Sequence, residues 1–166
     1  SQTSVRELLE RALNIARADL ELKTIDIQLN DINAEMTLQC IPSELEQVIL
    51  NLLQNAAQAL LEYKETVVSQ DWKPQINITT EQQNEQVIIK VKDNGPGMND
   101  ETRRRIFEPF FTTKDVGLGT GLGLSVSYFI ITAHHQGQLD VISSPNQGAC
   151  FIIKLPNKAI SINAPH

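Results

Sequence analysis

The chain has 166 residues, of which 41% are hydrophobic and 20% charged, and its formal net charge is −6. This length and composition fit one globular domain with a sizeable core, while the acidic balance argues against an electrostatic nucleic-acid binder and no apolar run approaches the ~20 residues of a membrane-spanning helix. The two cysteines, Cys40 and Cys150, have neither metal-site nor disulfide spacing, which indicates small core residues in a reducing compartment.

The first quarter of the chain shows a helical pattern followed by two strand patterns. Apolar residues at helical spacing predict a helix over 5–20. Thr3 or Ser4 is the candidate N-cap, and Glu7 would complete a capping box with Ser4. Alternating apolar and polar residues then predict strands over 25–29 and 36–40.

The next predicted helix, 42–61, begins at Pro42, which suits a first helical turn. Its apolar face, expected to pack on a sheet, consists of Leu45, Ile49, Leu52, Leu53, Ala56 and Leu60. The stripe about opposite carries Glu44, Gln47, Asn51, Asn55, Gln58 and Glu62. Asn51 and Asn55 are one turn apart, so their amides can meet at one point, and amide oxygens are hard ligands suited to Mg²⁺. A solvated helix face is the alternative interpretation.

The rest of the chain predicts an α+β domain. Its expected elements are a polar loop over 62–73, strands over 76–80 and 87–91, a helix over 122–133, and strands over 138–143 and 149–155. The strands are mainly joined as hairpins, so helices should be layered on one face of a sheet. We expect one domain over 1–156 and a polar tail over 157–166. The chain opens on Ser1 rather than methionine, so we expect it to be a piece of a longer protein.

Two glycine-rich clusters point to a phosphate ligand. The first, D-N-G-P-G-M, spans 93–98, and the second, G-L-G-T-G-L-G-L-S, spans 117–125. They are about 20 residues apart and bracket a segment too long for an ordinary connection, which is typical of a lid. The second cluster leads into the predicted helix, so it can present backbone N–H groups where phosphate is favoured. This independent signal favours the metal-binding interpretation of Asn51 and Asn55 over the solvated face.

Four sequence blocks, in order, carry a family resemblance. They are E-L-E-Q-V-I-L-N-L-L-Q-N-A-A-Q-A (44–59), D-N-G-P-G-M, F-E-P-F-F-T-T-K (107–114) and G-T-G-L-G-L-S (119–125). Together they resemble the N, G1, F and G2 boxes of the catalytic ATP-binding domain of sensor histidine kinases, whose superfamily includes DNA gyrase and chaperone ATPases. The resemblance implies a two-layer α/β sandwich of the Bergerat type, with a mixed sheet of about five strands covered by three helices.

The resemblance also implies roles for individual residues. Asp93 accepts a hydrogen bond from the adenine amine, while Gly95 and Gly97 let the chain pass close to the base. Asn55 binds Mg²⁺, and Asn51 lies beside it. A turn-capping Asp before Asn-Gly is the structural alternative for Asp93.

Further implied ligand contacts lie in and after the lid. Lys114 reaches the terminal phosphate, and with Asn51 and Asn55 it forms the implied catalytic set. Other implied cofactor-binding residues are Phe107, Thr113, Gly119, Gly121, Leu122 and Gly123. Phe107, Phe110 and Phe111 indicate either local lid packing or a hydrophobic hook for a partner domain, and these interpretations are compatible.

The chain departs from the family pattern at several positions. Hydrolysing members of the superfamily have a glutamate base where this chain has Asn51, and an amide cannot take a proton from water. Ile41 stands where the family commonly has an aspartate, and Ala149 replaces a threonine that helps to bind adenine. None of the histidines, His134, His135 and His166, lies in an acceptor motif, so we expect them to be structural or solvated.

The predicted function is that of a histidine kinase catalytic domain. It would bind ATP and Mg²⁺ and donate the γ-phosphoryl group to a histidine on the dimerisation and phosphoacceptor domain of the same parent protein. A response regulator would receive the group downstream. We expect a cytoplasmic domain, either of a cytoplasmic protein or of a membrane-anchored sensor, that itself neither inserts into membrane nor binds nucleic acid. The rival hypotheses are an ATPase of the gyrase or chaperone type, which Asn51 disfavours, and a non-catalytic nucleotide-sensing module.

Overall fold

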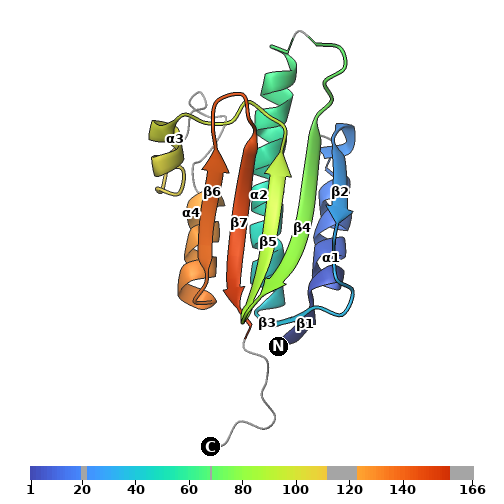
Figure 1. Ribbon diagram of the computed structural model, residues 1–166, viewed down its shortest axis with the longest axis vertical. Helices are drawn as coiled ribbons and strands as arrows, with labels where there is room; N and C mark the ends of the chain where they lie inside the picture. The colour runs from blue at the N-terminus through green and yellow to red at the C-terminus, as the bar shows by residue number, and fades with distance from the viewer. Residues whose placement is uncertain (20–21, 68, 112–122, 158–166) are drawn as a thin grey trace, which may run out of the picture.

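In a computed structural model of the chain, the structure describes residues 1–19, 22–67, 69–111 and 123–157. Within these residues, five strands form one sheet in the order β2-β4-β5-β7-β6 (Figure 1). Their bounds are Asp26–Asn30 (β2), Gln75–Gln83 (β4), Gln86–Asp93 (β5), Gln138–Ser143 (β6) and Ala149–Pro156 (β7). Strand β2 pairs with β4 in parallel, and the other neighbours are antiparallel. The predicted mixed sheet is confirmed.

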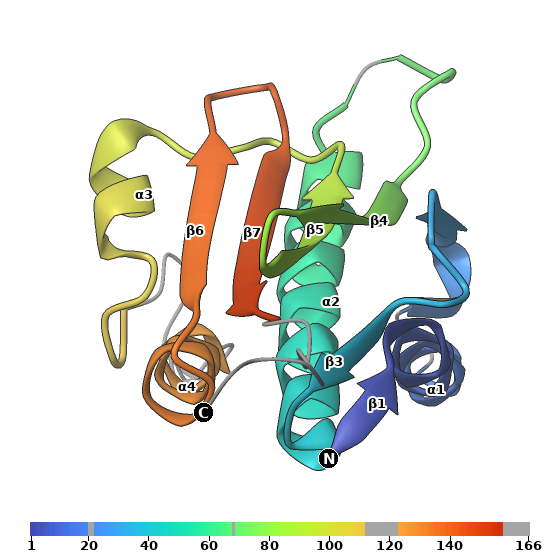
Figure 2. The same cartoon turned by 60° about the horizontal axis from the view of Figure 1, so that its bottom comes forward.

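Three helices lie behind one face of this sheet, and the turned view shows the same layering (Figures 1 and 2). They are α1 (Val5–Arg17), α2 (Pro42–Lys64) and α4 (Gly123–Phe129), the last continued by a π-helical segment over Ile130–His134. The apolar face predicted for α2 is completely buried. It packs with inward-facing strand residues such as Ile76, Ile89 and Ile153. The α+β sandwich predicted from the sequence is therefore the observed architecture.

Helix α1 begins after Ser4, one of the two predicted N-caps. The Ser4 hydroxyl accepts the backbone N–H of Glu7 at 3.3 Å, and the helix ends at Arg17, three residues before the predicted boundary. Both cysteines are free, and burial raises the pKa of the Cys40 and Cys150 thiols above its usual range. Buried, protonated thiols are poor nucleophiles.

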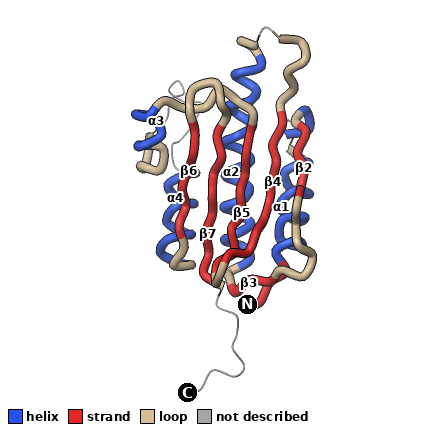
Figure 3. The backbone as a smooth tube through the Cα atoms, in the orientation of Figure 1, coloured by secondary structure: helices blue, strands red, loops and turns tan. Residues whose placement is uncertain are grey.

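Other elements differ from the sequence prediction. A short strand, β1 (Gln2–Ser4), was not predicted; it pairs with β3 (Thr37–Gln39) in a separate two-stranded sheet, drawn in red in Figure 3. The short helix α3 (Asp100–Arg105) was not predicted either, and it lies beside the main sheet in Figure 1. Helix α2 extends to Lys64, three residues past the predicted end at Leu61. Tyr63 in this extra turn packs edge-on against Trp72.

Candidate functional site

Asp93 lies at the carboxyl end of β5, where the strand is buried between β4 and β7. Its side chain is only 5% exposed. Its Oδ1 accepts the backbone N–H of Gly95 at 2.9 Å and that of Ala149 at 3.3 Å. No described residue donates to its Oδ2. The carboxylate therefore has one oxygen fixed by the fold and one available as an acceptor.

The protonation of Asp93 is set by two opposing effects. Burial raises the pKa of the carboxyl group above its ordinary value of 3.8, and the bonds from Gly95 and Ala149 oppose that rise. Desolvation penalises the charged form, whereas hydrogen bonds to it favour it. The net direction of the pKa shift is upward, so desolvation outweighs the two hydrogen bonds.

The loop after Asp93 is pressed against the β6–β7 hairpin. Gly97 has φ +71°, and an added Cβ would overlap the Ser144 carbonyl, so a side chain there is excluded by both conformation and space. The Met98 N–H donates to Ser143 Oγ at 2.9 Å, and the Ser143 hydroxyl donates to the Gly148 carbonyl at 2.7 Å. The first glycine cluster is thus held in place by the last two strands.

A second set of contacts, which we call the Trp72 brace, holds the loop at Asn94 and was not predicted from the sequence. The Trp72 indole donates to the Asn94 carbonyl at 3.0 Å, and its ring packs edge-on against Tyr63 with centroids 5.4 Å apart. Asn94 donates from its side chain to the Lys73 carbonyl and accepts the Gln75 N–H. A tryptophan inside a polar segment was the available signal. The brace therefore secures Asn94, the residue that directly follows Asp93.

The two asparagines of α2 differ in their hydrogen bonding. Asn51 accepts from Gln47 Nε2 at 2.8 Å, and its Nδ2 donates to the Gly123 carbonyl and to Ser127 Oγ, both at 3.1 Å. Asn55 is partly buried, and no described residue hydrogen-bonds to its side chain. Asn55 therefore keeps a free amide oxygen, while Asn51 joins α2 to α4.

The aromatic residues of the F block divide into packed and exposed members. Phe107 stacks on Tyr128 with centroids 5.3 Å apart and meets Phe151 edge-on. The guanidinium of Arg105 lies 4.6 Å from the centre of the Phe111 ring. Phe110 is 73% exposed and has φ +64°, a conformation that is rare for an aromatic residue. Local packing therefore accounts for Phe107 and Phe111, whereas the Phe110 side chain faces solvent.

Several predicted site residues lie outside the described residues. These are Thr113, Lys114, Gly119, Gly121 and Leu122. Among the remaining predicted residues, the structure brings Asn51 of α2 and Gly123 of α4 together, and the loop after β5 contacts α2 at a different place. Asn51 contacts Gly123, and a Cβ added at Gly95 would lie 3.4 Å from Leu60 at the far end of α2. Helix α2 therefore runs from one glycine cluster to the other.

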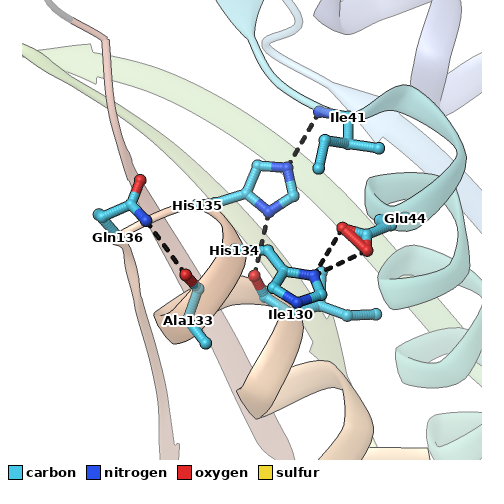
Figure 4. Close-up of polar contacts among 7 residues, drawn as sticks. All are labelled: Ile41, Glu44, Ile130, Ala133, His134, His135 and Gln136. Atoms are coloured by element: carbon cyan, nitrogen blue, oxygen red, sulfur yellow. Dashed lines mark hydrogen bonds and ion pairs between the residues drawn. The ribbon is translucent and has the colours of Figure 1, made fainter.

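Two histidines join the end of the π-helical segment to the start of α2 (Figure 4). The buried His135 accepts the Ile41 N–H on Nε2 and bonds the Ile130 carbonyl through Nδ1, each at 3.0 Å. Ile41 is the N-cap of α2 and supplies no side-chain bond of its own. His134 pairs with Glu44 at 2.8 Å. The prediction of structural histidines is confirmed for this pair, and His166 lies outside the described residues.

Comparison with known proteins places these features in context. Residues 40–159 match the family described as histidine kinase-, DNA gyrase B- and HSP90-like ATPases. The chain is 34% identical to sporulation kinase E of Bacillus subtilis and 39% identical to the signal transduction histidine-protein kinase AtoS of Escherichia coli, over 92% and 93% of its own length. It spans only 19% and 24% of the length of these relatives.

A solved structure shows the same fold. The catalytic domain of the histidine kinase ThkA superposes with a TM-score of 0.76 at 28% identity, over 95% of each chain. Among the described residues, no helix is both long enough and apolar enough to cross a membrane.

Proposed function

The chain belongs to the histidine kinase-, DNA gyrase B- and HSP90-like ATPase family, and from this premise we propose that it binds Mg·ATP and donates the γ-phosphoryl group to a histidine of a separate phosphoacceptor domain. Its relatives are named sensor kinases. In this proposal the chain is the cytoplasmic, nucleotide-binding part of a larger signalling protein.

Asp93 carries the proposal. A buried carboxylate with one oxygen bonded to Gly95 and Ala149 and the other available is suited to accept a hydrogen bond from an exocyclic amine. The adenine amino group is such a donor. The rigid strand end and the Trp72 brace fix the direction of that bond before the base arrives, which lowers the entropic cost of binding.

The donor set on α2 fits Mg²⁺ that is shared with phosphates. The described residues contain no group of three or more His, Cys, Asp or Glu that would form an all-protein metal cage. Mg²⁺ usually keeps several waters and takes few protein ligands alongside substrate phosphates, and the free amide of Asn55 meets that requirement. The bound ion would neutralise charge on the transferring group.

The chain's own contribution to the reaction is positioning. The γ-phosphoryl group passes to a histidine nitrogen of the acceptor domain, ADP leaves, and the histidine proton goes to a base of that domain. Lys114 is proposed to contact the terminal phosphate, with Thr113 and the glycines of the second cluster around the phosphate chain. Such preorganised charge and backbone contacts are the main source of catalysis in phosphoryl transfer.

The exposed Phe110 supports a role in docking the acceptor domain. An aromatic side chain that is 73% exposed in a strained backbone conformation is expensive unless it serves contact. The partner in this proposal is the dimerisation and phosphoacceptor domain of the same protein, and a response regulator takes the phosphoryl group from there.

A transfer assay tests the proposed function. The chain, labelled ATP and Mg²⁺ are incubated with and without the separately produced acceptor domain. We expect labelling of the acceptor domain, little labelling of the chain itself, and ATP turnover well below about 1 s⁻¹ when the chain is alone. Rapid hydrolysis without a partner would favour the ATPase rival, and nucleotide binding with no transfer would favour the sensing module.

A further inference from the structure

Two hydrogen bonds join α2 to α4, and one further bond within each helix supports them. Gln47 donates to Asn51 at 2.8 Å, Asn51 donates to Ser127 Oγ and to the Gly123 carbonyl, both at 3.1 Å, and Ser127 donates to the same carbonyl at 2.9 Å. All of these bonds run toward the Gly123 carbonyl, and bonds aligned in this way polarise one another. We call these four residues the Gly123 clamp.

Ser127 makes one hydrogen bond within its own helix and a second one to a residue of α2. Its bond to the carbonyl four residues earlier is an ordinary local bond, and Thr132 makes the same kind of bond to Tyr128 at 2.7 Å. Ser127, however, is 0% exposed and also accepts a hydrogen bond from Asn51 on another helix. Its hydroxyl is therefore used as both donor and acceptor across two helices.

The clamp sets the position of a glycine relative to a free amide. Gly123 is the last glycine of the second cluster, and Asn55 lies one turn beyond Asn51 on α2. A Cβ added at Gly123 would lie 3.9 Å from the Asn51 side chain, so the two elements are in direct contact. Because the clamp fixes Gly123 to α2, it also fixes the spacing between Gly123 and Asn55.

We propose that Ser127 and Gln47 are positioning residues for the phosphate groups of the nucleotide. They act through Asn51, which holds Gly123 at a fixed place beside Asn55. This inference rests on the proposed function, in which the second glycine cluster and Asn55 contact the phosphate end of Mg·ATP. The adenine end is held by Asp93, which shares no hydrogen bond with the clamp.

The test compares Mg·ATP with adenosine, which lacks phosphates, by calorimetric titration of the chain. In Ser127→Ala we expect the affinity for Mg·ATP to fall about 3- to 10-fold, as for the loss of one net hydrogen bond. The affinity for adenosine should stay within about twofold of the wild type, because the base contacts are unchanged. A general loss of stability would not produce this selectivity between the two ligands.

Thr132→Ala is the matched control, because Thr132 makes the same kind of local bond, to Tyr128, and has no hydrogen bond to α2. We expect it to leave both affinities unchanged. Gln47→Ala should weaken Mg·ATP binding in the same direction as Ser127→Ala, and the double variant should lose less than the product of the two effects, because the residues belong to one network.

The outcomes separate this inference from its premise. If the wild-type chain does not bind Mg·ATP, the proposed function fails and the clamp proposal with it. If the wild type binds and Ser127→Ala matches Thr132→Ala, the positioning role alone is overturned. If Ser127→Ala does not fold, the variant Gln47→Ala, at an exposed position, replaces it in the test. An unchanged ratio of the affinities for Mg·ATP and adenosine in Gln47→Ala would overturn the proposal.

Discussion

Asn51 and Asn55 lie one turn apart on α2, yet only Asn51 is hydrogen-bonded within the described part of the chain. Its amide oxygen accepts from Gln47 and its amide nitrogen donates to Gly123 and Ser127. The pair is therefore not a symmetrical ligand set. The Asn51 amide joins α2 to α4, and the Asn55 amide remains available to a ligand.

This asymmetry predicts the effect of Asn55→Ala. We expect phosphoryl transfer to the acceptor domain to fall by at least about 10-fold, as is typical when a metal site is disturbed, while the affinity for adenosine stays unchanged. The rate of transfer measured against Mg²⁺ concentration checks this. Gln54→Ala, an exposed position on the same helix, is the control. An unaltered Mg²⁺ dependence in Asn55→Ala would show that the amide is not a metal ligand.

Asp93→Asn should weaken nucleotide binding. The substitution preserves the shape of the side chain but removes the charge on the acceptor, and a hydrogen bond to a charged group is worth about 1.5–3 kcal/mol. We expect Mg·ATP and adenosine to lose affinity alike, roughly 10-fold or more. Asp140→Asn, which changes an exposed carboxylate on β6, is the control. Equal affinities in Asp93→Asn and the wild type would remove Asp93 from the adenine role.

The same substitution should change how stability depends on pH. Burial raises the pKa of Asp93 above 3.8, so between the unfolded and the folded pKa the folded chain binds more protons than the unfolded chain. The free energy of unfolding therefore falls as pH rises through that window, and the contribution is fully present only below the unfolded pKa. Asp93→Asn lacks this titration.

Urea unfolding of the two proteins at several pH values measures this effect. We expect the variant to gain stability relative to the wild type as pH rises from near 3.8 toward neutrality. The difference between the two unfolding free energies is the relevant quantity, because other groups titrate in both proteins alike. A difference that is independent of pH would contradict the raised pKa.

His135→Phe should destabilise the domain. The substitution leaves the part-buried Ile41 N–H and the buried Ile130 carbonyl without their His135 partner, and an unsatisfied buried group costs about 1–3 kcal/mol. We expect the free energy of unfolding to fall by about 2–4 kcal/mol. His134→Ala, which removes an exposed pair with Glu44, should cost at most about 1 kcal/mol. Urea denaturation of both variants decides, and equal losses would refute the capping role of His135.

The sequence predicted those features that local patterns encode. The N-cap at Ser4, the buried face of α2 and the position of Asp93 at the end of a strand all follow from spacing within one element. The features that were missed depend on distant partners. His135 bonds Ile41 across 94 residues, and Asn51 bonds Ser127 across 76. No local pattern specifies such pairs.

The missed elements have the same origin. Strand β1 is only three residues long and exists because β3 pairs with it, and the Trp72 brace exists because Asn94 presents its carbonyl to the indole. Propensity is too weak to predict such short elements, since tertiary contacts decide them. The different roles of Asn51 and Asn55 were likewise undecidable from their spacing.

The long sequence separations within the site also bear on the order in which the domain folds. Asp93 accepts a hydrogen bond from Ala149, which lies 56 residues later in the chain, and Asn51 donates one to Ser127, 76 residues later. Closing such long loops is slow because the entropy must be lost before the contacts form. During synthesis, α2 and β5 leave the ribosome well before the partners that complete them. The ligand-binding machinery is therefore expected to be among the last parts of the domain to become native, and a nascent chain is expected to be unable to hold its ligand until β7 has docked.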